Sequence, residues 1–172
     1  MLHSLEEISI SYNGGKDCLV LLVLFLAALA KYPGKLPKRL QSVYIISPHP
    51  FTEVDEFVDG SSADYQLDLA RYAMPMKAAF AQYLKDKPSV RAIFVGTRRT
   101  DPHGQLLTHF DATDHGWPPF MRIHPVIDWH YVEIWGVSTA WHQFKCSELT
   151  RSSSFAISTY PIASYTTRDT HP

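Results

Sequence analysis

A short polar loop near the amino terminus holds the residues with the clearest chemical potential. Asn13, Gly14, Gly15, Lys16 and Asp17 stand between an alternating apolar stretch and a long aliphatic run. A strand that turns through two glycines into a helix exposes backbone N–H groups beside the positive end of that helix. Such a corner binds anions, and phosphate groups in particular. Lys16 adds a mobile positive charge to it.

Asp17 is the unexpected member of this loop, because a carboxylate repels a phosphate group. Its presence predicts a metal ion, Mg²⁺, that bridges the carboxylate and the phosphate oxygens. The spacing matches neither GxxxxGK[ST] nor GxGxxG, the two common phosphate-binding patterns. A tight turn that carries ordinary surface charges is the alternative, and the loop alone leaves both interpretations open.

A second group of candidate residues follows a buried strand expected at residues 91–96. Arg98 and Arg99 are permanently charged planar donors that suit phosphate oxygens. Trp117 offers a face on which a planar aromatic ligand could stack, and it could equally be a core residue. Four histidines lack metal-ligand spacing and are interpreted as loop or surface residues: His49, His103, His109 and His124. Of these, the last is the best candidate for another role.

The elements that must position these residues alternate between strands and helices. Apolar patterns predict strands at residues 8–12, 42–47, 65–72 and 91–96. Helices are expected at residues 17–31, 52–58 and 76–86, and Asp128 is expected to cap another helix through Trp135. This order predicts an α/β fold of three layers, with helices on both faces of a mostly parallel sheet. Such folds bind ligands beyond the carboxyl ends of the strands.

Composition and charge exclude several classes of protein. The chain has 172 residues, 45% hydrophobic residues and a net charge of −1, which indicates one globular domain without general attraction to nucleic acid or anionic lipid. Its two cysteines, Cys18 and Cys146, form no CxxC pair. The first residues lack a secretory pattern, and the apolar run from Cys18 to Ala30 is too short to span a membrane. We therefore expect a cytoplasmic protein without an obligate protein partner.

With its flanking residues the loop is SYNGGKDC, which resembles the SGGKDS pyrophosphate loop of the PAPS reductase-like ATP pyrophosphatases. Its asparagine and cysteine are more similar to the eukaryotic, fungal-type FAD synthases, or FMN adenylyltransferases. The resemblance continues through GTRRTDP and TDHGWPPFMR and covers roughly residues 6–137. It implies an adenine nucleotide alpha hydrolase-like fold. It also implies a reaction of ATP with FMN that gives FAD and pyrophosphate with Mg²⁺ as the cofactor.

The resemblance also implies a role for individual residues. The ATP site would comprise Ser11, Asn13, Gly14, Gly15, Lys16, Asp17, Ser47 and Arg98. The flavin site would comprise Arg99, Asp101, Asp114, Trp117, Met121 and Arg122. Within these sets the catalytic residues would be Asn13, Asp17, Asp101 and Asp114, and Asp17 would bind the metal. Without the resemblance, Asp101 and Asp114 would be interpreted as helix caps or turn formers.

Beyond Val137 the sequence departs from this family. The usual PYC.LY..GYTSLG and T..NP.L segments are replaced, and only YTTRDTHP echoes them. We therefore divide the chain into a PAPS reductase-like domain at residues 1–137 and an atypical, poorly ordered segment at residues 138–172. In that segment Arg168 and Asp169 are the further candidates. The departure predicts a chain that binds ATP but forms FAD slowly.

Two other functions stay open at this point. One is a PAPS reductase or a thiolating tRNA ATP pyrophosphatase, which would use the same loop with a different substrate. These enzymes need reactive cysteines, and Cys146 stands outside the pattern that surrounds the reductase cysteine. The other is a non-catalytic remnant that binds a nucleotide or a flavin without turnover.

Overall fold

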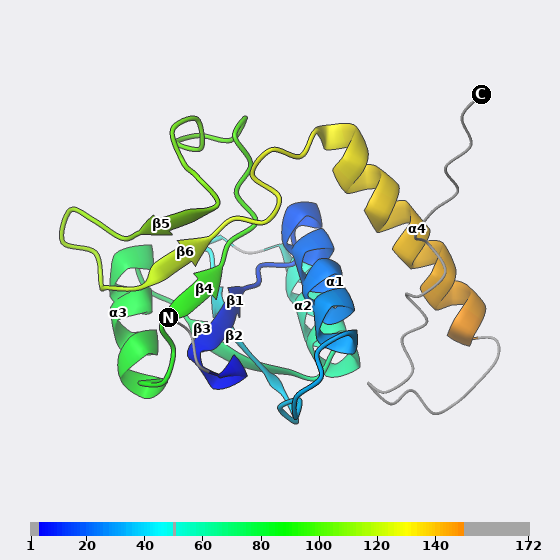
Figure 1. The fold of residues 1–172 in the computed structure, drawn as a ribbon, viewed down its shortest axis with the longest axis horizontal. Helices are drawn as coiled ribbons and strands as arrows, with labels where there is room; N and C mark the ends of the chain where they lie inside the picture. The colour runs from blue at the N-terminus through cyan, green and yellow to red at the C-terminus, as the bar shows by residue number, and fades with distance from the viewer. Residues whose placement is uncertain (1–3, 50, 150–172) are drawn as a thin grey trace.

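The computed structural model describes residues 4–49 and 51–149 (Figure 1). Its centre is a six-stranded sheet with the order β3-β2-β1-β4-β6-β5. The strands are β1 Ile8–Ser11, β2 Leu40–Ile45, β3 Leu67–Tyr72, β4 Ala92–Phe94, β5 Phe110–Ala112 and β6 Met121–Ile123. Neighbouring strands pair in parallel, except β5, which is antiparallel to β6. The expected α/β class with a mostly parallel sheet is confirmed.

Helices cover both faces of this sheet. Within the described residues they are α1 Lys16–Ala30, α2 Thr52–Asp64, α3 Met76–Asp86 and α4 Tyr131–Leu149, and the 3₁₀-helix Leu5–Glu7 precedes β1. Figure 1 shows α1 and α2 on one face, α3 on the other, and α4 on the outer side of α1. The three expected layers are therefore present, and α4 lies outside them. None of the described helices combines the length and the apolar character that a membrane crossing requires.

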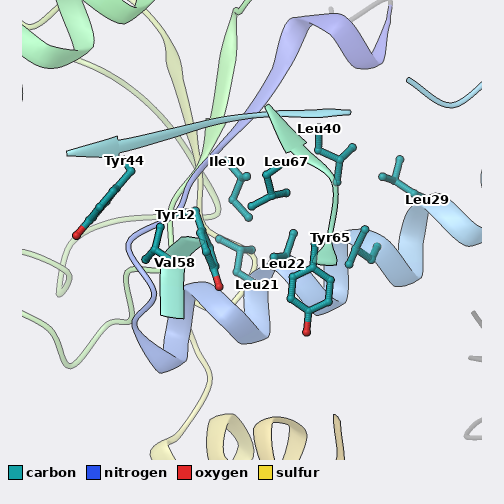
Figure 2. Packing of buried hydrophobic residues seen from close by; sticks show 11 residues of the cluster. Ile10, Tyr12, Leu21, Leu22, Leu29, Leu40, Tyr44, Val58, Tyr65 and Leu67 are labelled. Carbon is teal, nitrogen blue, oxygen red and sulfur yellow. The ribbon is translucent and has the colours of Figure 1, made fainter. Parts of the chain in front are cut away.

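The larger apolar core fills the space between the sheet and the helices α1 and α2 (Figure 2). Ile10 and Tyr12 project into it from the strand side and Leu21 and Leu22 from α1, and all four are buried. The Tyr12 hydroxyl donates a hydrogen bond to Ser61 Oγ at 2.9 Å, which attaches α2 to the strand that leads into the polar loop. The residue that directly precedes the polar loop is thus anchored in the larger core.

A second core lies on the opposite face, under α3. Ala79, Phe80 and Tyr83 of this helix pack against Val43 and Ile93 of the sheet. The Tyr83 hydroxyl lies 2.6 Å from Ser9 Oγ, so the polar atoms of both buried side chains are bonded. This packing holds α3 close to the carboxyl ends of β4 and β6.

Helix α1 is apolar on all sides because it is covered on two sides. Leu21 and Leu22 face the sheet, whereas Val20 packs against Val126 and Ile134 on the side of α4. The even distribution of apolar residues around α1 thus has a direct cause in the position of α4.

Helix α2 differs from its predicted bounds. It continues to Asp64, although the sequence after Val58 predicted an end there. The hydroxyls of Ser61 and Ser62 donate to carbonyls one turn earlier, Phe57 O at 2.6 Å and Val58 O at 2.5 Å, so both serines stay within the helix. Its first residue is Thr52, which was expected to be its cap.

Helix α4 begins later and ends later than predicted. Asp128 was expected to cap it, but α4 starts at Tyr131, and the Glu133 carboxylate accepts from the His130 backbone N–H at 2.6 Å. This is the return bond of a capping box. The helix continues beyond Trp135 to Leu149.

The helix therefore crosses the proposed boundary between residues 137 and 138. Beyond that boundary Trp141 Nε1 donates to the Tyr65 hydroxyl at 2.7 Å. The division of the chain into two segments stays a prediction, and Arg168 and Asp169 lie outside the described residues.

The two remaining strands lie in a region that the sequence analysis treated as loop. Both β5 and β6 have only three residues. A segment this short shows too few alternations to separate it from a loop. Their pairing extends the sheet beyond β4 and forms one wall of the site described below.

We predict that the contact between α1 and α4 contributes substantially to stability. Ile134 is completely buried, and its replacement by alanine should lower the free energy of unfolding by about 2–5 kcal/mol through lost burial and a cavity. The matched control is Val132→Ala in the same helix, because Val132 is 79% exposed and should change it by less than about 0.5 kcal/mol. Urea denaturation measures both, and equal effects would contradict the packing described.

Candidate functional site

A cavity of about 510 Å³ lies at the carboxyl ends of β1, β4 and β6. From β1 the chain proceeds to β2 on one side, whereas from β4 it proceeds to the opposite side of the sheet. This reversal is the place where α/β folds bind their ligands. Polar lining residues include Ser11, Asn13, Asp101, Asp114, Arg122 and His124, and apolar ones include Met76, Phe80, Leu107, Trp117 and Phe120.

The predicted site residues fall into three groups. Those that line the cavity are Ser11, Asn13, Asp101, Asp114, Trp117 and Arg122. The second group does not line the cavity but is linked to it: Gly15 and Arg98 bond to the lining residues Asn13 and Asp101, Asp17 pairs with Arg98 and Lys16, and Gly14 precedes Gly15. The third group neither lines the cavity nor belongs to this network: Ser47, Arg99 and Met121. Ser47 is exposed, and its hydroxyl accepts from the His49 backbone N–H at 3.4 Å.

The glycine loop has a geometry that only glycine accepts at its centre. Gly14 has a φ of +73°, and a Cβ atom there would lie 2.8 Å from Val58 Cγ2. Asn13 Oδ1 accepts from the Gly15 backbone N–H at 2.9 Å, so the asparagine side chain closes the turn. Helix α1 begins directly afterwards at Lys16, without a side-chain cap. The loop therefore leaves the positive end of α1 open toward the cavity side.

A buried arginine connects this loop to the segment after β4. Arg98 is 9% exposed; its Nε lies 2.8 Å from Asp17 Oδ1 and its Nη2 lies 3.3 Å from Asp101 Oδ1. The Arg98 backbone N–H also donates to Asp101 Oδ2 at 2.8 Å. A Cβ atom at Gly104 would lie 2.1 Å from the Arg98 carbonyl oxygen, so the turn can close only over a glycine. The charge of Arg98 is thus balanced by two carboxylates.

Arg99 has a different environment from its neighbour. Its Nε lies 2.6 Å from Asp128 Oδ1, and its Nη1 donates to the carbonyls of Gln105 at 3.1 Å and Leu107 at 2.9 Å. The hydrogen bond with Asp128 raises the pKa of Arg99 and lowers the pKa of Asp128. The bonds of Arg99 therefore hold the loop after β4 against the turn before α4. The role of Arg99 in flavin binding stays a prediction.

An apolar wall forms the other side of the cavity. The ring centroids of Phe80 and Trp117 are 6.4 Å apart, and those of Phe80 and Phe120 are 5.1 Å apart. Trp117 is 37% exposed, so it is not a core residue. These three rings come from α3 and from the loop before β6. They provide a surface suited to a planar aromatic ligand.

Two basic residues near the end of β6 face the same cavity. Arg122 Nη2 donates to the Ala112 carbonyl at 3.2 Å, while its buried Nε has no hydrogen-bond partner among the described residues. His124 follows β6 outside any helix or strand but is 1% exposed, so it is not the surface residue that the sequence suggested. Burial lowers the pKa of His124, and the nearby Arg122 charge lowers it further.

Cys18, Phe80 and His124 are among the lining residues that the sequence analysis did not assign to the site. Phe80 lies on the predicted apolar face of its helix, and helix periodicity alone does not separate a core position from a cavity wall. The sequence analysis used Cys18 for the disulfide and metal arguments and for the family resemblance, but gave it no place in the site. Burial raises the pKa of its thiol to about 11, so the thiol is protonated and a poor nucleophile at neutral pH.

The described residues contain no group of three or more His, Cys, Asp or Glu side chains that could hold a metal ion. Asp17 lies between two cations, because Lys16 Nζ is 2.7 Å from its Oδ2 and Arg98 approaches its Oδ1. Its buried Oδ1 makes no hydrogen bond within the described residues. This arrangement fits a Mg²⁺ ion that takes most of its other ligands from phosphate oxygens and water.

The chain is similar in sequence to a family of known proteins. The phosphoadenosine phosphosulfate reductase domain family matches the chain over residues 7–88 and again over residues 71–151. The protein called probable FAD synthase in Schizosaccharomyces pombe is 40% identical over 146 residues, which is 83% of this chain and 55% of that protein. The flavin adenine dinucleotide synthase of Saccharomyces cerevisiae is 36% identical over 75% of this chain and 49% of its own length.

A solved structure resembles the fold as well as the sequence. The FMN adenylyltransferase of Candida glabrata, in complex with FMN and the ATP analogue AMPCPP, matches with a TM-score of 0.73 and 38% identity. The match covers 77% of this chain and 48% of that protein. This chain thus spans about half the length of the relatives that it matches.

We predict that acid weakens the fold partly through His124. The pKa of His124 is lowered from 6.5 in the folded protein, so as the pH falls below 6.5 the unfolded chain binds a proton that the folded chain resists. The contribution of His124 to the free energy of unfolding is therefore fully present above pH 6.5, and it is lost as the pH falls through the lowered pKa of the folded protein. His124→Gln should show a smaller loss of unfolding free energy between pH 7 and pH 5 than the wild type.

Urea denaturation at both pH values measures this difference. Replacement of the exposed His49 by glutamine is the control and should leave the pH dependence unchanged. Parallel pH dependences of the wild type and His124→Gln would contradict the burial of this histidine.

Proposed function

The chain belongs to the phosphoadenosine phosphosulfate reductase domain family, and we propose that it is an FMN adenylyltransferase, or FAD synthase. The proposed reaction transfers AMP from ATP to FMN and gives FAD and pyrophosphate. One observation carries the proposal. The cavity is bordered by both the glycine loop and the aromatic wall. The chain that forms it is 38% identical to an enzyme whose structure was solved with FMN and an ATP analogue. The cytoplasm is the proposed location.

ATP would bind at the glycine loop, with its β- and γ-phosphates at the start of α1. Backbone N–H groups around Gly14 and Gly15 and the positive helix end favour these anions. Lys16 supplies a charge near the loop surface, since its side chain is 30% exposed. Ser11, Asn13, Ser47 and Arg98 complete the proposed ATP site.

FMN would bind on the β6 side of the same cavity. Its ring system would lie against Trp117, and its phosphate would meet Arg122, whose Nε makes no hydrogen bond to the described residues. The other two arginines are bonded to carboxylates, Arg98 to Asp17 and Asp101 and Arg99 to Asp128. Four more residues stay proposed for the flavin site: Arg99, Asp101, Asp114 and Met121.

The proposed chemistry is an in-line displacement at the α-phosphorus of ATP. An oxygen of the FMN phosphate forms a bond to this phosphorus, and the bond to the bridging oxygen of pyrophosphate breaks. No covalent intermediate with the protein is required, so the chain contributes alignment of two anions and electrostatic stabilisation. Asn13, Asp101 and Asp114 would orient the reacting groups. A Mg²⁺ ion, held by Asp17 and by phosphate oxygens, would neutralise charge on the leaving group.

The other functions have less support. A reductase or thiolating enzyme needs a reactive thiol, and Cys18, the cysteine of the cavity, is buried and protonated. A non-catalytic remnant would bind both ligands without turnover. Calorimetry with Mg·ATP and FMN, together with an assay for FAD formation, separates this possibility from the enzyme. Binding of both ligands without FAD formation would favour the remnant.

Replacement of Gly14 by alanine should weaken Mg·ATP binding at least tenfold, or about 1.4 kcal/mol. The side chain would strain the positive φ and collide with Val58, which would move the loop away from its phosphate-binding shape. Gly60→Ala is the matched control, because Gly60 lies in α2 with no atom within 4 Å of the added Cβ. Titration calorimetry measures both affinities, and an unchanged affinity in folded Gly14→Ala would contradict the assignment.

Arg122 should determine the preference for FMN over riboflavin. A charge-assisted hydrogen bond to a partly buried phosphate contributes roughly 1.5–3 kcal/mol, so Arg122→Gln should weaken FMN binding about tenfold or more. Riboflavin has no phosphate, and its affinity should stay within a factor of about two. Quenching of flavin fluorescence measures both ligands. Arg91→Gln, at an exposed arginine, is the control and should preserve the preference, whereas equal losses for both flavins would contradict this role.

A further inference from the structure

His124 is a buried polar residue whose hydrogen-bonding capacity is unused by the described residues. Its side chain lines the cavity, and neither Nδ1 nor Nε2 has a hydrogen-bond partner of ordinary geometry in the described part of the chain. Buried polar atoms are nearly always hydrogen-bonded in folded proteins, because an unmade bond costs free energy. Such a residue on a cavity wall indicates a partner that enters the cavity.

The backbone holds His124 firmly in place. Its N–H donates to the His109 carbonyl at 2.9 Å, and its own carbonyl accepts from the Ile127 N–H at 3.3 Å. The residue directly follows β6, which pairs with β4 on one side and with β5 on the other. The imidazole is therefore presented to the cavity by the sheet and not by a free loop.

Burial, above all, lowers the pKa of His124 and keeps the imidazole uncharged at neutral pH. Arg122 and His109 also disfavour its protonation, whereas Asp111, with Oδ2 at 3.9 Å from Nε2, and the backbone of Val95 favour it. The carboxylate of Asp111 is already engaged, because Oδ2 accepts from the Thr108 backbone N–H at 2.8 Å. A neutral imidazole carries one donor and one acceptor, so it suits uncharged polar atoms better than phosphate oxygens.

The position of His124 relates it to the flavin half of the cavity. The sheet order places β4 between β1, which carries the glycine loop, and β6, which carries Arg122 and His124. Phe120 and Trp117 precede β6 in the same segment and line the same cavity. A ligand that stacks on these rings would lie in the same cavity as the His124 imidazole.

We propose that His124 is a positioning residue for the flavin substrate and forms a hydrogen bond with an uncharged polar atom of the flavin ring or of its ribityl chain. This inference rests on the proposed function. It assigns to the cavity a second polar contact besides Arg122. The phosphate contact would determine how tightly FMN is held, and the contact with His124 would determine how the flavin is oriented.

The test compares two replacements of His124. His124→Phe fills a similar volume without any polar atom and should weaken FMN binding at least tenfold. His124→Gln retains a donor and an acceptor and should restore the affinity to within about threefold of the wild type. The affinity for Mg·ATP should stay within twofold in both variants, which a merely structural role would not produce. Calorimetry measures both ligands, and circular dichroism verifies the fold.

A matched control and the use of both flavins make the test specific. His109→Phe removes an exposed histidine that does not line the cavity and should leave FMN binding unchanged. Riboflavin carries the same ring and ribityl chain, so His124→Phe should weaken riboflavin as strongly as FMN, in contrast to Arg122→Gln.

The possible results separate this inference from the proposed function. If His124→Phe does not fold, His124→Ala replaces it in the same comparison. Unchanged flavin affinity in a folded variant, or failure of glutamine to restore it, would overturn the inference and leave the proposed function intact. Absence of FMN binding by the wild type would overturn both.

Discussion

The ion pairs of Arg98 are the interaction on which the arrangement of the site depends. This side chain joins Asp17 at the start of α1 to Asp101 in the loop after β4, two segments separated by most of the domain in sequence. A buried charge is costly unless it is paired, and removal of one partner from a buried pair costs about 3–5 kcal/mol. The glycine loop and the loop after β4 therefore hold each other in place. Because Lys16 shares the Asp17 carboxylate, a phosphate or metal that enters the loop must exchange partners with these cations.

Around this network the cavity separates into two chemically different halves. On the β1 side lie backbone N–H groups and a helix end, which suit a chain of phosphates. On the β6 side lie aromatic rings, one arginine and an uncharged histidine, which suit a planar ligand that carries a single phosphate. β4 ends at Phe94, and two residues later Gly96 approaches α1 so closely that an added Cβ would lie 3.1 Å from Cys18. The two halves thus offer different binding groups within one cavity.

The sequence was informative where a pattern extends over many residues or where a motif depends on the backbone. Helix α1 and strands β1 to β4 were predicted within a few residues, and Asn13, Asp101, Asp114, Trp117 and Arg122 do line one cavity. The sequence was uninformative where a single tertiary contact determines the role of a residue. Nothing in the sequence shows that Asp128 pairs with Arg99 instead of capping a helix, because that pair joins positions 29 residues apart. The burial of His124 depends on the three-residue strands β5 and β6, whose alternation is too short to recognise.

The central place of β1 in the sheet has a consequence for the order in which the chain is synthesised. β1 leaves the ribosome before the other strands of this sheet, and it can pair with β2 once residue 45 has emerged. Its other edge pairs with β4 and must wait for residues 92–94. During that interval the nascent chain carries an open, apolar strand edge that invites association with other chains. The same topology that places the glycine loop in the middle of the sheet therefore leaves one edge of β1 unpaired while the residues up to β4 are synthesised.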